Sequence, residues 1–154
     1  MHRRDAVMLA LFAGGTVLLG LGSGLSTIQA AQQYGQLQQP SWAPPGWLFG
    51  PVWTVLYALV GVAGFFLWRS GPRSAAMAAW GVQLVLNLAW TPLFFGLGWR
   101  GVALVNIVAL LAAIAVTLAL AWRRARLAAY LLLPYIAWVA FATALNAAVW
   151  ALNR

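Results

Sequence analysis

The sequence predicts an all-α protein, an integral membrane bundle of five transmembrane helices. Of the 154 residues, 64% are hydrophobic and only 6% are charged, and the mean hydropathy is +0.87. A soluble domain has about 25% charged residues, so most of the outer surface of this chain must face lipid. Five apolar runs are each long enough to cross a bilayer of about 30 Å as a helix, and they lack the alternating polarity of barrel strands.

The expected spans follow one another in a single domain over residues 1–154. They cover residues 6–28, 47–68, 74–97, 102–122 and 127–152. Arg3 and Arg4, which precede the first span, also fit the basic start of a secretory signal peptide. The apolar run after them is longer than the roughly 7–15 residues of such a signal. We therefore expect the first run to be a transmembrane helix.

Small residues mark expected helix contacts in the first and third spans. Gly20 and Gly24 are four residues apart and share one helix face, where a neighbouring backbone can approach closely. Close helix packing is the simpler interpretation, and a thin wall beside a bound ligand is the alternative. In the third span, Ala75, Ala78 and Ala79 form a similar small surface, which we expect to be a homodimer contact.

The long connection between the first two spans, residues 29–46, is expected to form a folded lid. Pro40, Pro44 and Pro45 exclude a continuous helix there and favour extended or turn geometry. The segment is rich in glutamine, carries no charge, and contains Tyr34 and Trp42. A neutral segment with aromatic residues among prolines is not typical of a solvated linker. We expect it to lie on the end of the bundle.

The arginines predict how the bundle is oriented. All nine basic residues are arginine, and the one acidic residue is Asp5. In a five-span arrangement, Arg100 and Arg154 fall on one side and seven arginines on the other: Arg3, Arg4, Arg69, Arg73, Arg123, Arg124 and Arg126. The positive-inside rule then places the N-terminus in the cytoplasm and the C-terminus outside, in a bacterial inner membrane. Because the arginines form short groups between apolar runs, topology explains them better than nucleic acid binding.

The scarcity of ionisable groups excludes most conventional enzyme sites. The chain has no cysteine, one histidine and one acidic residue. Disulfides, thiolate nucleophiles, catalytic triads, paired carboxylates and carboxylate metal cages are therefore ruled out. His2, beside the initiator methionine, is expected to be solvent-exposed rather than a haem ligand. We expect no metal site, no obligatory cofactor and no conventional catalytic site.

Three spans carry aromatic and polar side chains on one helix face. In the third span, Gln83, Asn87 and Trp90 are spaced i, i+4 and i+7. Amides that faced lipid would lack hydrogen-bond partners, so this face must look into the bundle. Interhelical hydrogen bonding is the simplest role, and contact with a ligand is the alternative. The second and fifth spans carry comparable faces, formed by Trp53 and Tyr57 and by Tyr135, Trp138, Ala142 and Asn146.

Tryptophan is over-represented, with ten residues in the chain. Those at the ends of the runs are typical of anchors at the headgroup level of a membrane. Trp53, Trp90 and Trp138 instead lie well inside their runs. A cavity lined by such rings and a few amides suits a large, flat, apolar ligand such as a tetrapyrrole or another polycycle.

Three ordered motifs stand out in the loop and the later spans. They are PSWAPPGW at residues 40–47 with Trp53 and Tyr57 after it, NLAWTPLFFG at residues 87–96, and PYIAW at residues 134–138 with Ala142 and Asn146 after it. In order and spacing they resemble the signature of the tryptophan-rich sensory protein family. This family includes the translocator proteins, also called peripheral-type benzodiazepine receptors.

The resemblance implies a five-helix bundle, often dimeric, with a ligand pocket beneath the loop that joins the first two spans. Family members bind porphyrins such as protoporphyrin IX and haem, and some bind sterols. Matched position by position, the pocket would comprise Tyr34, Trp42, Trp53, Tyr57, Gln83, Asn87, Trp90, Trp138, Ala142 and Asn146.

Two departures from the family pattern bear on the ligand. Many relatives carry a tryptophan and a lysine where this chain has Gln33 and Gln39, so a cation that could meet a porphyrin carboxylate is missing. The sterol motif needs a tyrosine and a basic residue where Ala147 and Ala151 stand. We therefore do not expect sterol binding.

Three functions are compatible with these features. The leading hypothesis is a membrane-embedded binding and sensory protein for porphyrin-type ligands, acting in tetrapyrrole homeostasis or stress response. Light-dependent breakdown of a bound porphyrin is an alternative that the resemblance implies. Transport of tetrapyrroles or lipids is a third. Against transport, the spans show no pair of matching halves and no intramembrane ionisable residue that could couple movement to protons.

Overall fold

The computed structural model describes residues 3–25 and 29–154. The predicted end of the first span at residue 28 and the prediction for His2 fall outside the described residues. The described part of the chain is helical and contains no strand, which confirms the predicted all-α class. Its elements are α1 (Arg3–Leu25), α2 (Ala30–Gln36), the 3-10 turn η1 (Gly46–Leu48), α3 (Phe49–Ser70), α4 (Ala75–Thr91), the π-helical turn η2 (Pro92–Gly96), α5 (Arg100–Arg124) and α6 (Arg126–Leu152).

Five segments are long and apolar enough to cross a membrane, as the sequence predicts. They contain 22 to 27 residues each when η1 and η2 are joined to α3 and α4. At a rise of about 1.5 Å per residue, even the shortest covers about 33 Å, enough for the hydrocarbon layer of a bilayer. Helix α1 begins three residues earlier than predicted and includes Arg3 and Arg4, whose long side chains can reach the headgroups from a helix end.

The third span ends in a different way from its prediction. The sequence predicts one span over residues 74–97, whereas α4 ends at Thr91 and η2 continues with wider turns. There the backbone N–H of Leu97 donates to the carbonyl of Pro92 at 2.8 Å. Pro92 has no N–H to donate, which interrupts the regular helix. Gly98 then adopts a φ of 66° and turns the chain into α5.

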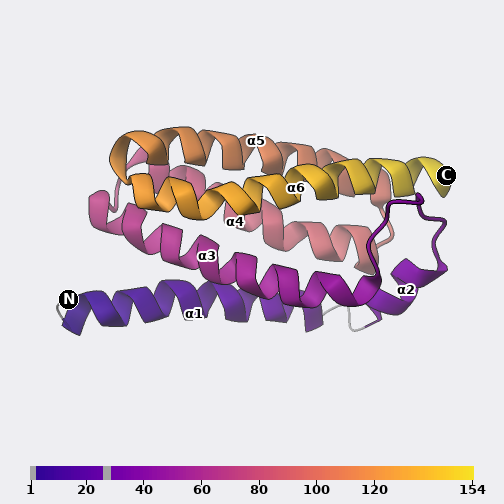
Figure 1. Cartoon of the computed structure of the whole chain (residues 1–154), viewed down its shortest axis with the longest axis horizontal. Helices are drawn as coiled ribbons and strands as arrows, with labels where there is room; N and C mark the ends of the chain where they lie inside the picture. The colour runs from indigo at the N-terminus through magenta and orange to yellow at the C-terminus, as the bar shows by residue number, and fades with distance from the viewer. Residues whose placement is uncertain (1–2, 26–28) are drawn as a thin grey trace.

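The five long helices form a closed ring in the order α1, α3, α6, α5 and α4. Figure 1 shows α1 along one edge beside α3 and α5 along the opposite edge, with the two termini at opposite ends. Helix α1 packs mainly on α3 and touches α4, and it is the least buried of the five spans. It therefore exposes the largest share of its surface among the five.

One end of the ring carries the seven arginines predicted to share a side. The start of α1, the end of α3 and the turn between α5 and α6 meet at this end (Figure 1). The guanidinium carbon of Arg4 lies 5.5 Å from the ring centre of Trp68. Arg100 and Arg154 belong to the opposite end, where α5 begins and α6 stops. Which end faces the cytoplasm stays a prediction.

Helices α1 and α3 are in close contact in the half of the bundle nearer the arginines. A β-carbon at Gly61 would overlap atoms of Phe12, Ala13 and Thr16, so only glycine fits at this point. The hydroxyl of Thr16 donates to the backbone carbonyl of Tyr57 at 2.8 Å. The backbones of the two helices are thus in close contact on the arginine side of Tyr57.

The loop over residues 29–46 folds onto the end opposite the seven arginines. Its first part is the short helix α2, and Pro40, Pro44 and Pro45 follow in extended and turn geometry. The side-chain amide of Asn153 donates to the carbonyl of Gln38 at 2.9 Å and accepts from the N–H of Gln38 at 3.0 Å. This pair of hydrogen bonds ties the loop to the end of α6.

The small face of α4 is only partly available for a homodimer contact. Ala75 and Ala78 are exposed, while Ala79 is partly buried. Val82 and Val85 extend the exposed surface along the same helix. A dimer through this face stays a prediction.

Candidate ligand-binding site

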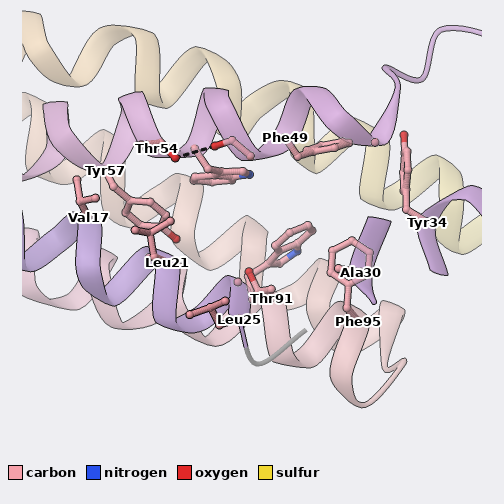
Figure 2. A pocket seen from close by; sticks show the side chains of 16 residues that line it. Val17, Leu21, Leu25, Ala30, Tyr34, Phe49, Thr54, Tyr57, Thr91 and Phe95 are labelled. Carbon is pink, nitrogen blue, oxygen red and sulfur yellow. Dashed lines mark hydrogen bonds between the residues drawn. The ribbon is translucent and has the colours of Figure 1, made fainter. Parts of the chain in front are cut away.

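A cavity of about 420 Å³ lies between α1, α3 and the α4–η2 segment, on the side of the folded loop. Figure 2 shows Leu21 and Leu25 of α1 on one side and Phe49 and Thr54 of α3 on the other. The described lining includes no charged side chain and consists of Val17, Gly20, Leu21, Gly24, Leu25, Ala30, Tyr34, Gly46, Phe49, Gly50, Trp53, Thr54, Tyr57, Trp90, Thr91 and Phe95. Its volume falls within the range of about 300–1,000 Å³ typical of small-molecule sites.

Gly20 places α1 at the end of this cavity that is farther from the loop. A β-carbon at Gly20 would overlap the ring of Tyr57, far inside van der Waals contact. Gly20 therefore both packs two helices together and forms part of the cavity wall. Close helix packing and a thin wall beside a ligand site, the two roles considered for Gly20 and Gly24 in the sequence, are thus both filled by Gly20.

A chain of hydrogen bonds behind Tyr57 crosses the bundle from α3 to α6. The hydroxyl of Tyr57 donates to Oδ1 of Asn87 at 2.6 Å, and Nδ2 of Asn87 donates to the hydroxyl of Tyr135 at 2.7 Å. The Tyr135 hydroxyl donates in turn to Oε1 of Gln83 at 2.7 Å. Gln83 and Asn87 are buried, and neither lines the cavity. Interhelical hydrogen bonding thus accounts for both amides, and Tyr57 is the member of the chain that reaches the cavity.

Trp90 forms part of the cavity wall, and a hydrogen bond and a stacking contact on its far side fix its ring. Its indole N–H donates to Oδ1 of Asn146 at 3.0 Å, and Nδ2 of Asn146 donates to the backbone carbonyl of Arg100 at 3.1 Å. The Trp90 ring stacks on Phe94 with a centroid separation of 5.1 Å. Ala142 and Asn146 line a second, smaller cavity of about 20 Å³, which shares Tyr34, Phe49, Trp53, Trp90 and Phe95 with the first.

Tyr34 links the folded loop to the cavity. Its ring is 4% exposed and meets Phe49 edge-on at 5.2 Å, and its hydroxyl donates to the carbonyl of Pro44 at 3.2 Å. Burial raises the pKa of the Tyr34 phenol above its usual value. The phenol therefore stays neutral, and it contributes a ring and a fixed hydroxyl rather than a charge.

Trp42 and Trp138 lie outside both cavities. Trp42 is 49% exposed and contacts Phe141 edge-on at 5.8 Å. Trp138 packs against Phe49 at 5.9 Å and against Phe141 at 5.4 Å. Its indole N–H is buried without a hydrogen-bond partner in the part of the chain that the structure describes. These rings support the cavity wall through Phe49 and the loop.

The ten predicted site residues thus fall into three groups. Tyr34, Trp53, Tyr57 and Trp90 line the larger cavity, Ala142 and Asn146 line the smaller one, and Trp42, Gln83, Asn87 and Trp138 line neither. Sequence reasoning missed Phe49, Thr91 and Phe95, although all three stand within or beside the quoted motifs. It also missed the leucines and Val17 of α1, which flank the face marked by Gly20 and Gly24, because apolar residues within an apolar span give no signal of their own.

Comparison with known proteins identifies relatives over nearly the whole chain. The model of the TspO/MBR family matches residues 7–151. The chain is 41% identical to the human Translocator protein over 139 residues, which cover 87% of this chain and 82% of that protein. It is 40% identical to the Tryptophan-rich protein TspO of Archaeoglobus fulgidus over 138 residues, covering 88% of this chain and 90% of that protein.

A third relative carries a name that refers to sensing. The Tryptophan-rich sensory protein of Cereibacter sphaeroides is 31% identical over 141 residues, covering 90% of this chain and 89% of that protein. These matches confirm the resemblance found in the three sequence motifs. With its five apolar spans, the chain is an integral membrane protein that belongs to the TspO/MBR family.

Proposed function

We propose that the protein binds flat, apolar ligands of the porphyrin type in the larger cavity and acts as a binding and sensory protein in tetrapyrrole homeostasis or stress response. The observation that carries this proposal is the cavity wall: Phe49, Trp53, Tyr57, Trp90 and Phe95 surround one space without a charged neighbour among the described lining residues. Aromatic rings offer large contact area and stacking to a flat macrocycle. The word "sensory" in a relative's name agrees with such a role.

The uncharged wall also restricts how a porphyrin could lie. Burying an ionised carboxylate without a partner is very costly, and the cavity offers no cation among its described lining residues to the two carboxylates of protoporphyrin IX. The macrocycle would occupy the aromatic space, and its carboxylates would point towards the loop end of the bundle, where the headgroup layer begins. The same wall would bind other flat apolar molecules of similar size.

Titration of protoporphyrin IX into the purified protein tests the proposal, with tryptophan fluorescence and porphyrin anisotropy as two readouts. Trp53→Leu removes a ring from the wall and should weaken binding about 10-fold, since one aromatic contact contributes about 0.5–1.5 kcal/mol beyond its buried area. Trp122→Leu is the matched control, because Trp122 is 43% exposed on α5 and lines neither cavity. Equal dissociation constants for the two variants would contradict the site.

Light-dependent breakdown of the bound porphyrin is a second candidate, because two tryptophans line the same cavity. Trp53 and Trp90 both border the space where the macrocycle would lie, and tryptophan can donate an electron to a photo-excited pigment. Illuminating the complex with and without oxygen, in the wild type and in Trp90→Phe, would separate the two functions. Loss of porphyrin absorbance that needs light, oxygen and Trp90 would support breakdown, whereas a pigment that remains intact would leave binding alone.

A further inference from the structure

We infer that the cavity exchanges its ligand with the hydrocarbon layer of the membrane, through a lateral opening between α1 and α3. We call this opening the α1–α3 mouth, and its rim consists of Leu21 and Leu25 of α1 and Gly50 and Thr54 of α3. The inference rests on the proposed function and narrows it. The ligands of this cavity would be molecules dissolved in the bilayer rather than in water.

The mouth exists because two helices that are in contact at one end separate towards the other. At Gly61, near the middle of α3, the two helices are in backbone contact, and at Gly20, nearer the loop, α1 lies against the ring of Tyr57. One and two turns beyond Tyr57, towards the loop, Thr54 and Gly50 occupy the face of α3 that follows on from this contact. Both are exposed, and a β-carbon at Gly50 would meet no described atom within 4 Å. The seam between α1 and α3 is therefore open at this level.

Exposure of the lining residues shows where the cavity opens. Leu21 is 48% exposed and Leu25 is 67% exposed, although both line the cavity. By contrast, the lining residues on the α4–η2 segment, Trp90, Thr91 and Phe95, are all partly buried. Figure 2 shows Leu21 and Thr54 on opposite sides of the cavity, one from each helix of the seam.

The mouth faces lipid rather than water because of its depth. Trp47, at the start of the second span, is 72% exposed, which is typical of a ring at the headgroup level. Thr54 lies seven residues further along α3, about 10 Å deeper at 1.5 Å per residue. Its hydroxyl donates to the carbonyl of Gly50 at 2.9 Å, so this polar side chain leaves no donor unpaired at an apolar surface. The rim at the level of Thr54 is therefore compatible with the hydrocarbon layer.

In the described part of the chain, several contacts of the loop lie between the cavity and water. Tyr34, at the loop end of the cavity, is almost fully buried, and its hydroxyl donates a hydrogen bond to the carbonyl of Pro44. Gln38 and Asn153 exchange two hydrogen bonds, and Trp42 lies against Phe141. A ligand leaving through the loop must break these contacts, whereas none of them closes the α1–α3 mouth.

Exchange kinetics with vesicle-borne protoporphyrin IX test the route. Thr54→Phe places a bulky ring on the rim and should slow association and dissociation at least fivefold. Val55→Phe is the matched control, because valine and threonine have nearly the same shape and Val55 is 59% exposed on α3 without lining the cavity. Should Thr54→Phe fold poorly, Leu21→Ala should accelerate exchange, with Leu18→Ala, at a position that is 71% exposed and away from the cavity, as its control.

A second experiment fixes the loop and asks whether the ligand leaves through it. Since the chain has no cysteine, Gln38→Cys combined with Asn153→Cys gives one disulfide that fixes the loop to α6. Exchange rates that are unchanged by oxidation, together with slow exchange in Thr54→Phe, would support the mouth. Exchange that stops on oxidation, or rates that are equal in Thr54→Phe and Val55→Phe, would overturn it while binding sensitive to Trp53 still stands. Absence of any binding in the wild type would overturn the proposed function and the route together.

Discussion

At the scale of single residues, Gly20 illustrates how the absence of a side chain positions a binding surface. The ring of Tyr57 occupies the space where a β-carbon of Gly20 would lie. From there the Tyr57 hydroxyl reaches Asn87 at 2.6 Å. A larger residue at position 20 would push the ring, and with it the end of the buried hydrogen-bond chain.

Gly20→Ala is therefore expected to destabilise the protein by about 1–3 kcal/mol, the usual cost of an overpacked contact. Gly22→Ala is the control, because Gly22 lies on the same helix and is exposed, and a β-carbon added there would meet no described atom within 4 Å. Thermal unfolding in detergent, followed by circular dichroism, measures the difference. Equal unfolding temperatures for the two variants would show that Tyr57 can move aside without cost.

Tyr135 is the centre of the buried hydrogen-bond chain. Its hydroxyl accepts from Asn87 and donates to Gln83, so Tyr135→Phe leaves one donor and one acceptor without a partner. We expect a loss of about 1–2 kcal/mol in the free energy of unfolding. Tyr130→Phe, at a position of the same helix that is 54% exposed, should change the unfolding temperature very little. A stable Tyr135→Phe protein would indicate that the amides find other partners.

At the scale of elements, the folded loop and the end of α6 act as one unit. The described loop over residues 29–46 contains the short helix α2, and two hydrogen bonds between Gln38 and Asn153 attach it to the end of α6. The prolines explain why the helix stops, but the attachment to α6 joins residues 115 positions apart in the chain. Such a contact follows from the ring order of the helices.

Asn153→Ala should loosen the loop without unfolding the bundle. The two lost hydrogen bonds cost about 1 kcal/mol each, so the backbone amide of Gln38 should exchange with deuterium about 30-fold faster. Arg154→Ala is the control, since Arg154 lies over the ring of Trp150 at 4.6 Å instead. Hydrogen exchange followed by mass spectrometry gives the comparison. Similar exchange in the two variants would contradict the attachment.

At the scale of the whole molecule, charge separates the two ends of the bundle. Seven arginines lie at one end, and the uncharged loop lies at the other, with only Arg100 and Arg154 among the described charged residues there. A membrane with an inside-negative potential and anionic lipid on its inner face favours the arginine-rich end on the inside.

Single cysteines test this orientation directly, since the natural chain has none. Ser41→Cys lies in the loop and Ser70→Cys ends α3 near the arginines, and both positions are exposed. In intact bacterial cells a membrane-impermeant maleimide should label Ser41→Cys at once and Ser70→Cys only after the cells are permeabilised. The reverse pattern would place the arginine-rich end outside.

The sequence alone determines the class and the membrane-spanning segments of this protein. Apolar runs of 20 or more residues with almost no charge have one physical solution in lipid, the helix, and three local motifs are enough to indicate the family. Trp53, Tyr57 and Trp90 could also be selected, because they lie inside apolar runs on the same helix faces as polar groups, which must turn away from lipid. Tyr34 lies in the loop, and only the family resemblance implied its place in the pocket.

The tertiary structure alone decides which of these inward groups reach the cavity. Gln83 and Asn87 share a helix face with Trp90. Their side-chain amides, however, form hydrogen bonds with Tyr135 and Tyr57, so Gln83 and Asn87 lie behind the cavity wall and do not line the cavity. The wall contributed by α1 comes from a mostly apolar span, and its position depends on Gly61, where two backbones meet, and on Gly20, where the ring of Tyr57 lies against α1. Periodicity along one helix gives the direction of a side chain, but the space in front of that side chain depends on how closely the neighbouring helix approaches.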